Sequence, residues 1–566
     1  MRTYRNSTLV IFLLSLFLSF ILYGNTIDGE FVYDDAVFST RPEMQKPAYL
    51  LQLWGEPLVH NNPATGIWRP LLSITFALNY LLFGESPASF HILNIIANGI
   101  ATFFVYLFIK RLSNNTKLGI CSALFFAFFP IHTGSVAFIK ARDEILSTIL
   151  ILLSWIYFLK TVDTKPNPKF IHLGMSVFFF ALALLMKEQS VMAPMFFVGL
   201  EVVRSGIPPL RSLFLLCLPY GIMIGIYILV RYLVLGEYLF AHDNLYFTSN
   251  VLQDSGLWVG IWTAFKIAFV YIGKTFIPIN LSATYTYNHL SLVLNPLTSL
   301  QTILGLIFIA LLITLIFWNK TRRTPLAYGA TIFLLCYLPV SRFIFKGSGE
   351  ILEENWMYLP TLGLSLIAGY LLLQSYQRNK TVAVIVASVI FLIYGTVTIN
   401  RNNVWHNKFS LYHSMVASAP DSISGYFFLA DIYYSSGDYN RASEFAEKAY
   451  RIYPDHPRIL NLQAKLLMLQ GQYKEAEYLL LKSMSIRSGT PESNTLYARI
   501  LAKQGRYTES LNHLLPFLAI DPDHKELHYL IALNLYKLGK SEEAKKYFDW
   551  RSDISEAEKI KLLELF

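Results

Sequence analysis

The chain has 566 residues, of which 54% are hydrophobic, 15% aromatic and only 15% charged. Soluble proteins carry about 25% charged residues, so this composition, with a mean hydropathy of +0.42, excludes an ordinary soluble domain and indicates an integral membrane protein. The formal net charge is +9, but the basic residues sit mainly between apolar segments. That distribution argues against nucleic-acid binding and fits the orientation of a membrane protein.

The N-terminal segment begins with basic residues and continues into a long apolar core without a small-residue cleavage site. It therefore predicts an uncleaved signal anchor. The three cysteines, Cys121, Cys217 and Cys336, all lie inside apolar segments. This placement favours buried small side chains over disulfides or metal ligands.

Apolar segments long enough to cross a bilayer recur up to about residue 400. With the N-terminus inside, the inner connections, such as KRLSNNTK and NKTRRTP, are basic, as the positive-inside rule requires. The first loop, about 25–88, and the C-terminal region then lie outside. The segment 258–278 breaks this alternation, so we expect a re-entrant or interfacial helix there. The eleven expected spans are about 8–24, 89–110, 118–133, 144–161, 168–186, 189–203, 211–235, 299–318, 325–343, 356–375 and 380–400.

Beyond residue 400 the sequence is polar and repeats every 34 residues. The period is visible in glycines and alanines at equivalent positions: Gly437, Gly471, Gly505 and Gly539, and Ala430, Ala464, Ala498 and Ala532. A 34-residue period with a Gly turn is that of the tetratricopeptide repeat, a pair of antiparallel helices that needs a neighbour to bury its apolar face. The sequence thus predicts an all-α protein with a membrane domain over 1–400, a linker over 401–420 and about four repeats over 421–566.

The stretch GEFVYDDAVF places two adjacent carboxylates, Asp34 and Asp35, just beyond the first span. An isolated acid pair is usually a solvated loop, but the apolar flanks here indicate packing at the membrane surface. Further polar clusters fall on the same side of the predicted topology. These clusters are Arg69 with Asn79; His91 with Asn94; His132, Lys140, Arg142, Asp143 and Glu144; Lys187 and Glu188; and Glu350, Glu353 and Glu354.

Each cluster also has a purely structural explanation. His132 could cap a span at the interface, and Lys187 and Glu188 could form a juxtamembrane ion pair. Because ionisable groups at membrane depth are costly, the clusters together favour an outward-facing polar site. A carboxylate beside Arg, Lys and His suits transfer from a phosphorylated lipid, with the acid as base and the cations stabilising the departing phosphate. The sequence has no Walker loop, no GxGxxG motif and no metal-spaced His/Cys set.

These stretches resemble a known family. In order along the chain, the stretches concerned are FVYDDAVF, WRPLLSITFALNYLLFG, FHILNIIANG, FFAFFPIHTGSVAFIKARDEIL, ALLMKEQSV, ENWMYLPTLG, NRNNVW and the repeats. They are similar to the transmembrane and tetratricopeptide-repeat-containing O-mannosyltransferases of the GT-C superfamily. The resemblance implies a polyprenyl-phosphate sugar donor, dolichyl or undecaprenyl, and an inverting transfer on the outer or lumenal side. The sugar would be mannose or a relative, and the acceptor a hydroxyl such as that of protein Ser or Thr.

In this family the first-loop acid is the catalytic base, which by position is Asp34 or Asp35. We expect Asp34 to be the base and Asp35 to support it, because adjacent side chains point in different directions. The resemblance places other residues around the donor. Those expected to line the site or to bind the donor phosphate or substrate are Arg69, His91, His132, Arg142, Asp143, Lys187, Glu188 and Glu354.

The chain departs from the family pattern in some places. The family has an acid–Arg pair before its LYLPS-like segment, whereas here Glu354 is followed by Asn355. No metal ligand is predicted, although some superfamily members use a divalent cation at their first-loop acids. The repeats would engage a protein acceptor, and their small number favours a bacterial inner membrane over the endoplasmic reticulum. The alternative is a non-enzymatic, membrane-anchored repeat scaffold, which would need only one span and no outer polar clusters.

Overall fold

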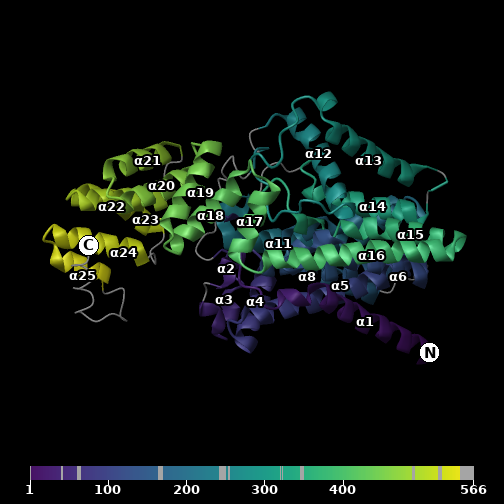
Figure 1. Ribbon diagram of the computed structural model, residues 1–566. Helices are drawn as coiled ribbons and strands as arrows, with labels where there is room; N and C mark the ends of the chain where they lie inside the picture. Colours follow the sequence, from purple (N-terminus) through teal and green to yellow (C-terminus); the bar gives the residue numbers. More distant parts are fainter. Residues whose placement is uncertain are drawn as a thin grey trace. The chain divides into compact units, whose positions relative to one another are not determined.

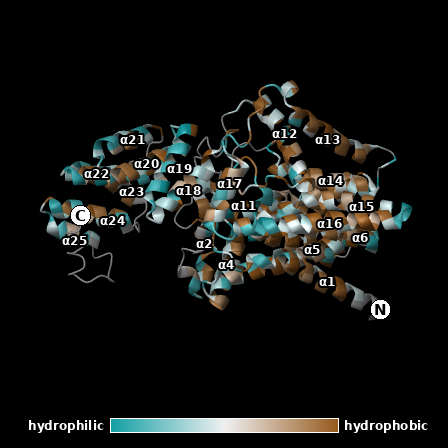
Figure 2. Ribbon diagram, viewed as in Figure 1, coloured by the Kyte–Doolittle hydropathy of each residue, from teal (hydrophilic) through white to brown (hydrophobic). Residues whose placement is uncertain are grey.

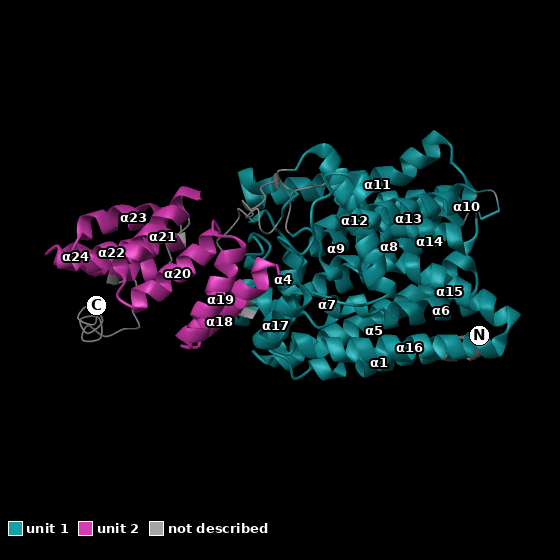
Figure 3. Cartoon of the chain, turned by 45° about the horizontal axis from the view of Figure 1, so that its top comes forward, with its two compact units in different colours: residues 1–420 teal, residues 421–566 magenta. Residues whose placement is uncertain are grey.

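The computed structural model (Figure 1) describes residues 2–39, 42–59, 65–163, 170–240, 250–252, 255–318, 320–321, 323–343, 350–486, 491–520 and 525–548. Within these ranges the chain is helical and contains no β-strand beyond one isolated bridge between Tyr285 and Leu352. The predicted all-α fold class is confirmed. The chain forms two compact units, Met1–Pro420 and Asp421–Phe566 (Figure 3), which we call the membrane unit and the repeat unit.

The membrane unit combines long helices with short helices and connecting segments. Its α-helices are α1 (Arg2–Tyr23), α2 (Ala36–Ser39), α3 (Tyr49–Gln52), α4 (Pro70–Phe83), α5 (Pro87–Ser113), α6 (Thr116–Phe128), α7 (Thr133–Val136), α8 (Arg142–Asp163), α9 (Phe170–Met186), α10 (Ala193–Ser205), α11 (Leu210–Leu235), α12 (Leu257–Phe276), α13 (Leu300–Phe317), α14 (Pro325–Tyr337), α15 (Thr361–Arg378), α16 (Lys380–Asn402) and α17 (Lys408–Ser418). Helices α11 and α13 expose large apolar side chains such as Leu233 and Ile307, and α13 is largely brown in Figure 2. Such all-round apolar helices suit a lipid environment.

Several helices in the described part of the chain can cross a membrane. Seven are long and apolar enough, and a bent pair, Thr116–Phe128 with Pro130–Val136, would make eight. A multi-pass membrane protein is therefore confirmed, but the predicted count of eleven spans is not. Helix α12, expected as an interfacial helix, meets the criterion for a span by length and composition, so its interfacial placement stays a prediction.

Helices α14 and α15 approach one another closely through two glycines. A Cβ on Gly363 would overlap the carbonyl oxygen of Gly329 and the backbone nitrogen of Phe333. Gly329 lies inside α14, where glycine is about 1 kcal/mol less favourable than alanine, and Gly363 lies in the first turn of α15. The close approach of the two backbones explains why glycine occupies both positions.

The substitution Gly363→Ala is expected to destabilise the membrane unit by about 1–3 kcal/mol, because the added methyl group overlaps backbone atoms that cannot move aside. Gly174→Ala in α9 is the matched control, since a Cβ there meets nothing within 4 Å. Its gain in helix propensity is expected to raise stability slightly. Thermal unfolding of the two purified variants in detergent should give midpoints shifted in opposite directions. Equal shifts would contradict the close packing.

The repeat unit contains four antiparallel helix pairs, which confirms the predicted tetratricopeptide repeats. The pairs are α18 (Ile423–Ser435) with α19 (Tyr439–Ile452), α20 (Pro457–Leu469) with α21 (Tyr473–Ile486), α22 (Pro491–Lys503) with α23 (Tyr507–Ile520), and α24 (Lys525–Lys537) with α25 (Ser541–Phe548). The four predicted turn glycines all have positive φ, between 76° and 82°, a conformation that glycine adopts without penalty. The equivalent alanines are buried. Residues 549–566 of the expected repeat domain lie outside the described part.

The segment 401–420, expected as a linker, is mostly helical. It holds the end of α16, a short 3-10 turn over Asn403–Trp405 and helix α17. These residues belong to the membrane unit, whose boundary falls after Pro420.

Candidate active site in the membrane unit

The acid pair of the first loop sits in a strained turn. Residues Tyr33–Asp35 form a 3-10 turn that runs into α2, and Tyr33 has φ +51°, which is unfavourable for a bulky side chain. The side chain of Asp35 stabilises the turn, because its Oδ2 accepts a hydrogen bond from Val32 N at 3.0 Å. Its Oδ1 accepts another from Lys140 N at 2.8 Å, which ties the loop to the turn before α8.

Asp34 and Asp35 differ sharply in exposure. Asp35 is fully buried, and burial raises its pKa to about 7 against the opposing effect of the two N–H donors. The side chain of Asp34 is 45% exposed, and its Oδ2 lies 2.5 Å from Nζ of Lys140. Lys140 therefore holds both acids, one through its backbone and the other through its side chain. Only Asp34 is accessible to another molecule.

A second segment, just before α15, approaches the same place. The Tyr33 hydroxyl donates to Glu350 Oε1 at 2.9 Å. Burial, together with the charges of Glu353 and Asp34, raises the pKa of Glu350 well above its usual range. Burial likewise raises the pKa of Glu353, with the negative charge of Asp34 adding to it and Lys140 opposing it. Four acids, Asp34, Asp35, Glu350 and Glu353, and one lysine, Lys140, thus interact around the first-loop turn.

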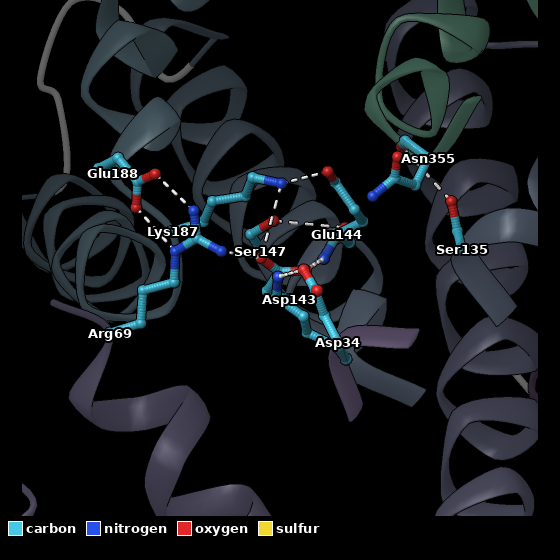
Figure 4. Close-up of polar contacts among 10 residues, drawn as sticks. Asp34, Arg69, Ser135, Asp143, Glu144, Ser147, Lys187, Glu188 and Asn355 are labelled. Carbon is cyan, nitrogen blue, oxygen red and sulfur yellow. Dashed lines mark hydrogen bonds and ion pairs between the residues drawn. The ribbon is translucent and has the colours of Figure 1, made fainter. Parts of the chain in front are cut away.

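An ion-pair network lies at the ends of α4, α8 and α9 (Figure 4). Arg69 donates from Nε and Nη2 to the two carboxylate oxygens of Glu188, at 2.8 and 2.5 Å, and from Nη1 to Asp143 at 2.5 Å. Lys187 contacts Glu144 and lies 3.6 Å from Asp143. Burial opposes the effect, but the Arg69 guanidinium still lowers the pKa of Glu188 well below its usual range. The structure therefore brings together Arg69, Asp143, Lys187 and Glu188, four of the residues that the sequence predicted.

The network has more acids than bases. Two cations, Arg69 and Lys187, face three carboxylates, those of Asp143, Glu144 and Glu188. Both cations already have carboxylate partners, so a phosphate that bound there would have to compete with them. Lys187 and Glu144 line a cavity of about 30 Å³, together with residues that include Ser147, Ser190 and Trp356. It has room for about two water molecules and none for a sugar.

Arg142 has a different environment from its sequence neighbours. Its guanidinium is buried and donates to Asn94 Oδ1 at 2.7 Å and to Asn79 Oδ1 at 3.0 Å. It also stacks on Phe76, 4.4 Å from the ring centroid. Neutral amides and an aromatic ring thus satisfy this side chain inside the fold.

The two predicted histidines are also enclosed by protein. His132 Nε2 lies 2.7 Å from Thr361 Oγ1, and its ring packs against Tyr358. His91 is buried against the backbone of Gly29, where an added Cβ would lie 3.1 Å from its Nε2. His132 thus links the turn before α7 to the start of α15, and His91 packs α5 against the loop that contains Gly29.

Glu354 lies apart from the ion-pair network. It is buried, and its Oε1 accepts hydrogen bonds from Ser282 N at 2.8 Å and from the Tyr285 hydroxyl at 2.5 Å. It fixes the segment around Ser282 to the start of the turn before α15. Among the described residues, no group of three His, Cys, Asp or Glu side chains is arranged to hold a metal ion.

Five residues of this region are absent from the predicted site: Tyr33, Lys140, Glu144, Glu350 and Glu353. Lys140 and Glu144 were noticed only as members of a polar cluster, yet they are the direct partners of Asp34 and Lys187. Their place beside Arg142 and Asp143 was a usable signal. Tyr33 had no such signal, because nothing in the local sequence requires a tyrosine to adopt positive φ.

Comparisons with known proteins agree with the resemblance seen in the sequence. Residues 69–231 match the family model described as dolichyl-phosphate-mannose-protein mannosyltransferase. Residues 401–483 and 470–550 match a model described as anaphase-promoting complex, cyclosome, subunit 3.

Three similar curated proteins are from animals. Protein O-mannosyl-transferase F38B6.6 of Caenorhabditis elegans is 27% identical over 76% of this chain and 61% of its own length. Protein O-mannosyl-transferase TMTC1 of Homo sapiens is 24% identical over 78% of this chain and 55% of its own length. Tmtc1 of Drosophila melanogaster is 33% identical over 31% of this chain and 21% of its own length. The chain thus spans little more than half the length of the first two relatives. Their animal origin does not support the expected bacterial inner membrane.

Two solved structures share weaker similarity. ArnT from Cupriavidus metallidurans, bound to undecaprenyl phosphate, gives a TM-score of 0.42 at 12% identity over 90% of this chain and 80% of ArnT. YrrB, a tetratricopeptide-repeat protein, gives a TM-score of 0.23 at 18% identity over 34% of this chain and 96% of YrrB. These TM-scores are too low to support an argument from either structure.

Proposed function

We propose that this chain, which is similar to the TMTC O-mannosyltransferases over about three quarters of its length, is an integral membrane glycosyltransferase. It transfers a sugar from a polyprenyl-phosphate-linked donor to a hydroxyl acceptor, that of protein Ser or Thr, on the outer or lumenal side of its membrane. Asp34 acts as the base. The repeat unit binds the protein acceptor.

The observation that carries this proposal is the contrast between the two first-loop acids. Asp35 is buried and accepts hydrogen bonds from backbone N–H groups, whereas Asp34 exposes its carboxylate beside Lys140. A general base must reach the proton that it removes. Asp34 is exposed and can reach such a proton. Asp35 stabilises the turn that positions Asp34.

The proposed reaction is a single displacement at the anomeric carbon of the donor. The Asp34 carboxylate takes the proton of the acceptor hydroxyl as its oxygen attacks this carbon. The bond from the anomeric carbon to the phosphate oxygen breaks, and its electron pair leaves with the polyprenyl phosphate. One bond forms on the face opposite the one that breaks, so the configuration inverts.

Lys140 is the cation best placed to act in this step. Its ammonium group contacts the Asp34 carboxylate. Its partner Asp34 is 45% exposed, against 28% for Glu188 and 5% for Asp143 and Glu144, so solvent or substrate can replace Asp34 more readily than the partners of Arg69 and Lys187. We therefore propose that Lys140 stabilises the departing phosphate, while the Arg69 network holds α4, α8 and the end of α9 together around it.

The proposal is tested by reconstituting the purified chain in proteoliposomes with a mannosyl-phosphoryl polyprenol and a Ser/Thr-rich peptide. Mass spectrometry of the peptide should then show added hexose that depends on both protein and donor. Donors with other sugars define specificity. If no donor gives a modified peptide or a modified co-purified protein, the transferase proposal is wrong and the scaffold alternative gains support.

Tyr33→Phe is expected to lower kcat about tenfold with little change in KM. The loss of the hydrogen bond to Glu350 loosens the turn that positions Asp34. Tyr49→Phe is the matched control, because its hydroxyl also donates to a glutamate, Glu56, at 2.6 Å in the same loop but away from Asp34. The measurement is steady-state transfer by both variants. An equal fall in kcat for both would mean that Tyr33 has no special positioning role.

A further inference from the structure

A large cavity lies on the membrane unit between α12 and the segment that leads into α13. Its volume is about 520 Å³, within the range of about 300–1,000 Å³ that is common for small-ligand sites. None of the residues that line it is acidic. They are Lys266, Ser291, Leu292, Val293, Leu294, Asn295, Thr298, Ser299, Leu300 and Gln301.

The cavity contains one buried cation. Lys266 comes from the middle of α12 and is 8% exposed. Its ammonium group donates to the backbone oxygen of Ser291 at 3.0 Å and to its hydroxyl at 2.8 Å. An ammonium group has three N–H donors, and no carboxylate lines the cavity. A lysine inside an apolar helix is costly unless its ammonium group meets an anion or water. Lys266 faces this cavity, which can hold either.

The N-terminus of α13 opens on the same cavity. Ser299, Leu300 and Gln301 are lining residues, and Ser299 Oγ caps the helix by accepting from Thr302 N. The free N–H groups and the dipole of an 18-residue helix favour an anion at this end. Two independent features, Lys266 and the helix end, thus favour negative charge in one place.

The walls of the cavity are held in position without a ligand. Val293 N donates to Thr263 Oγ1 on α12 at 3.0 Å. Helices α12 and α13 pack so closely that a Cβ on Gly305 would overlap the backbone of Phe265. The cavity is therefore preformed.

The rim of the cavity is apolar and exposed. Leu294, Leu297 and Leu300 are each more than two-thirds exposed, and Trp258 at the start of α12 is also exposed. Exposed apolar side chains with tryptophan are typical of a membrane interface. Helix α13, which begins at this rim, is largely apolar (Figure 2). A ligand of this cavity would therefore be one that the membrane itself supplies.

We propose that this cavity binds the phosphodiester head group of a membrane lipid. The phosphate accepts hydrogen bonds from Lys266 and from the N-terminus of α13, and the side chains of Asn295 and Gln301 bond to head-group hydroxyls. The single charge of Lys266 matches the single negative charge of a phosphodiester. The acyl or prenyl chain leaves over the leucine rim. The proposal does not depend on the transfer reaction, and two lipids share the chemistry: an anionic phospholipid and a polyprenyl-phosphate sugar.

The test uses the full chain, delipidated in detergent, with dioctanoyl phosphatidylglycerol as the probe and dioctanoyl phosphatidylcholine as the zwitterionic comparison. Native mass spectrometry should show one retained phosphatidylglycerol on the wild-type chain, and weaker retention of phosphatidylcholine. Lys266→Gln is expected to weaken phosphatidylglycerol binding about tenfold. Lys274→Gln is the matched control on the same helix, because the ammonium group of Lys274 donates to the carbonyls of Ile279 and Asn280 and does not line the cavity.

A second variant tests the proposal independently if Lys266→Gln does not fold. Gln301→Glu places an acid at an exposed position in the first turn of α13, where it favours the helix but repels a phosphate, so its binding should also fall. Unchanged phosphatidylglycerol binding by Gln301→Glu, or by folded Lys266→Gln, would overturn the proposal, as would equal loss in Lys274→Gln. Competition with a mannosyl-phosphoryl polyprenol then identifies the source: displacement assigns the site to the sugar donor, and retained phosphatidylglycerol assigns it to bulk phospholipid.

Discussion

Asp34→Asn is expected to lower kcat for sugar transfer about a thousandfold or more, while the chain folds and inserts as the wild type does. An amide cannot take the proton of the acceptor hydroxyl, and general-base catalysis contributes about 10²–10⁴-fold. The folding cost should be small, because both Asp34 and its partner Lys140 reach solvent and exposed ion pairs contribute at most about 1 kcal/mol. The measurement is transfer to a peptide by equal amounts of folded protein.

Asp35→Asn is the control that distinguishes the catalytic base from a residue that only stabilises the turn. Both oxygens of Asp35 accept from backbone N–H groups inside the fold, and an asparagine would turn an NH₂ group toward one of these donors. The expected result is a loss of about 1–3 kcal/mol of stability, with reduced yield but measurable transfer per folded molecule. If folded Asp35→Asn were inactive and Asp34→Asn fully active, the assignment of the base to Asp34 would be wrong.

The repeat unit was predictable because its signal is local and periodic. Each turn glycine must adopt positive φ and each buried alanine must allow helices to touch, so the residues recur at a fixed interval. The span count was less predictable. Helices α10, with 13 residues, and α15, which ends in polar residues, do not qualify alone as spans. Helices that pack among others need neither the length nor the apolar composition of a lipid-exposed span.

The candidate site could be predicted only in part, because the sequence locates the charged residues but does not show which of them pair. The predicted topology groups these acids and bases on one side, and four of the predicted site residues, Arg69, Asp143, Lys187 and Glu188, do meet. Pairing could not be predicted, because it depends on side-chain direction after folding. Arg142 follows Lys140 by two residues, yet it points to Asn79 and Asn94, while Lys140 points to Asp34.

Arg69→Met is expected to destabilise the membrane unit by about 3–5 kcal/mol, the effect of removing one partner from a buried ion pair. The loss leaves the carboxylates of Glu188 and Asp143 without their guanidinium partner, beside the carboxylate of Glu144. Arg111→Met is the matched control, because its contact with Asp163 has the same length, 2.5 Å, but its side chain is 40% exposed against 11% for Arg69. That loss should be at most about 1 kcal/mol.

The measurement is the unfolding midpoint of both variants in the same detergent, together with the double variant Arg69→Met/Glu188→Met. Since the double variant removes one of the uncompensated acids and replaces it with an apolar side chain, it should regain part of the stability that Arg69→Met loses. Equal midpoints for Arg69→Met and Arg111→Met would mean that the network is hydrated in the membrane. A double variant no more stable than Arg69→Met would show that Arg69 acts through Asp143 rather than Glu188.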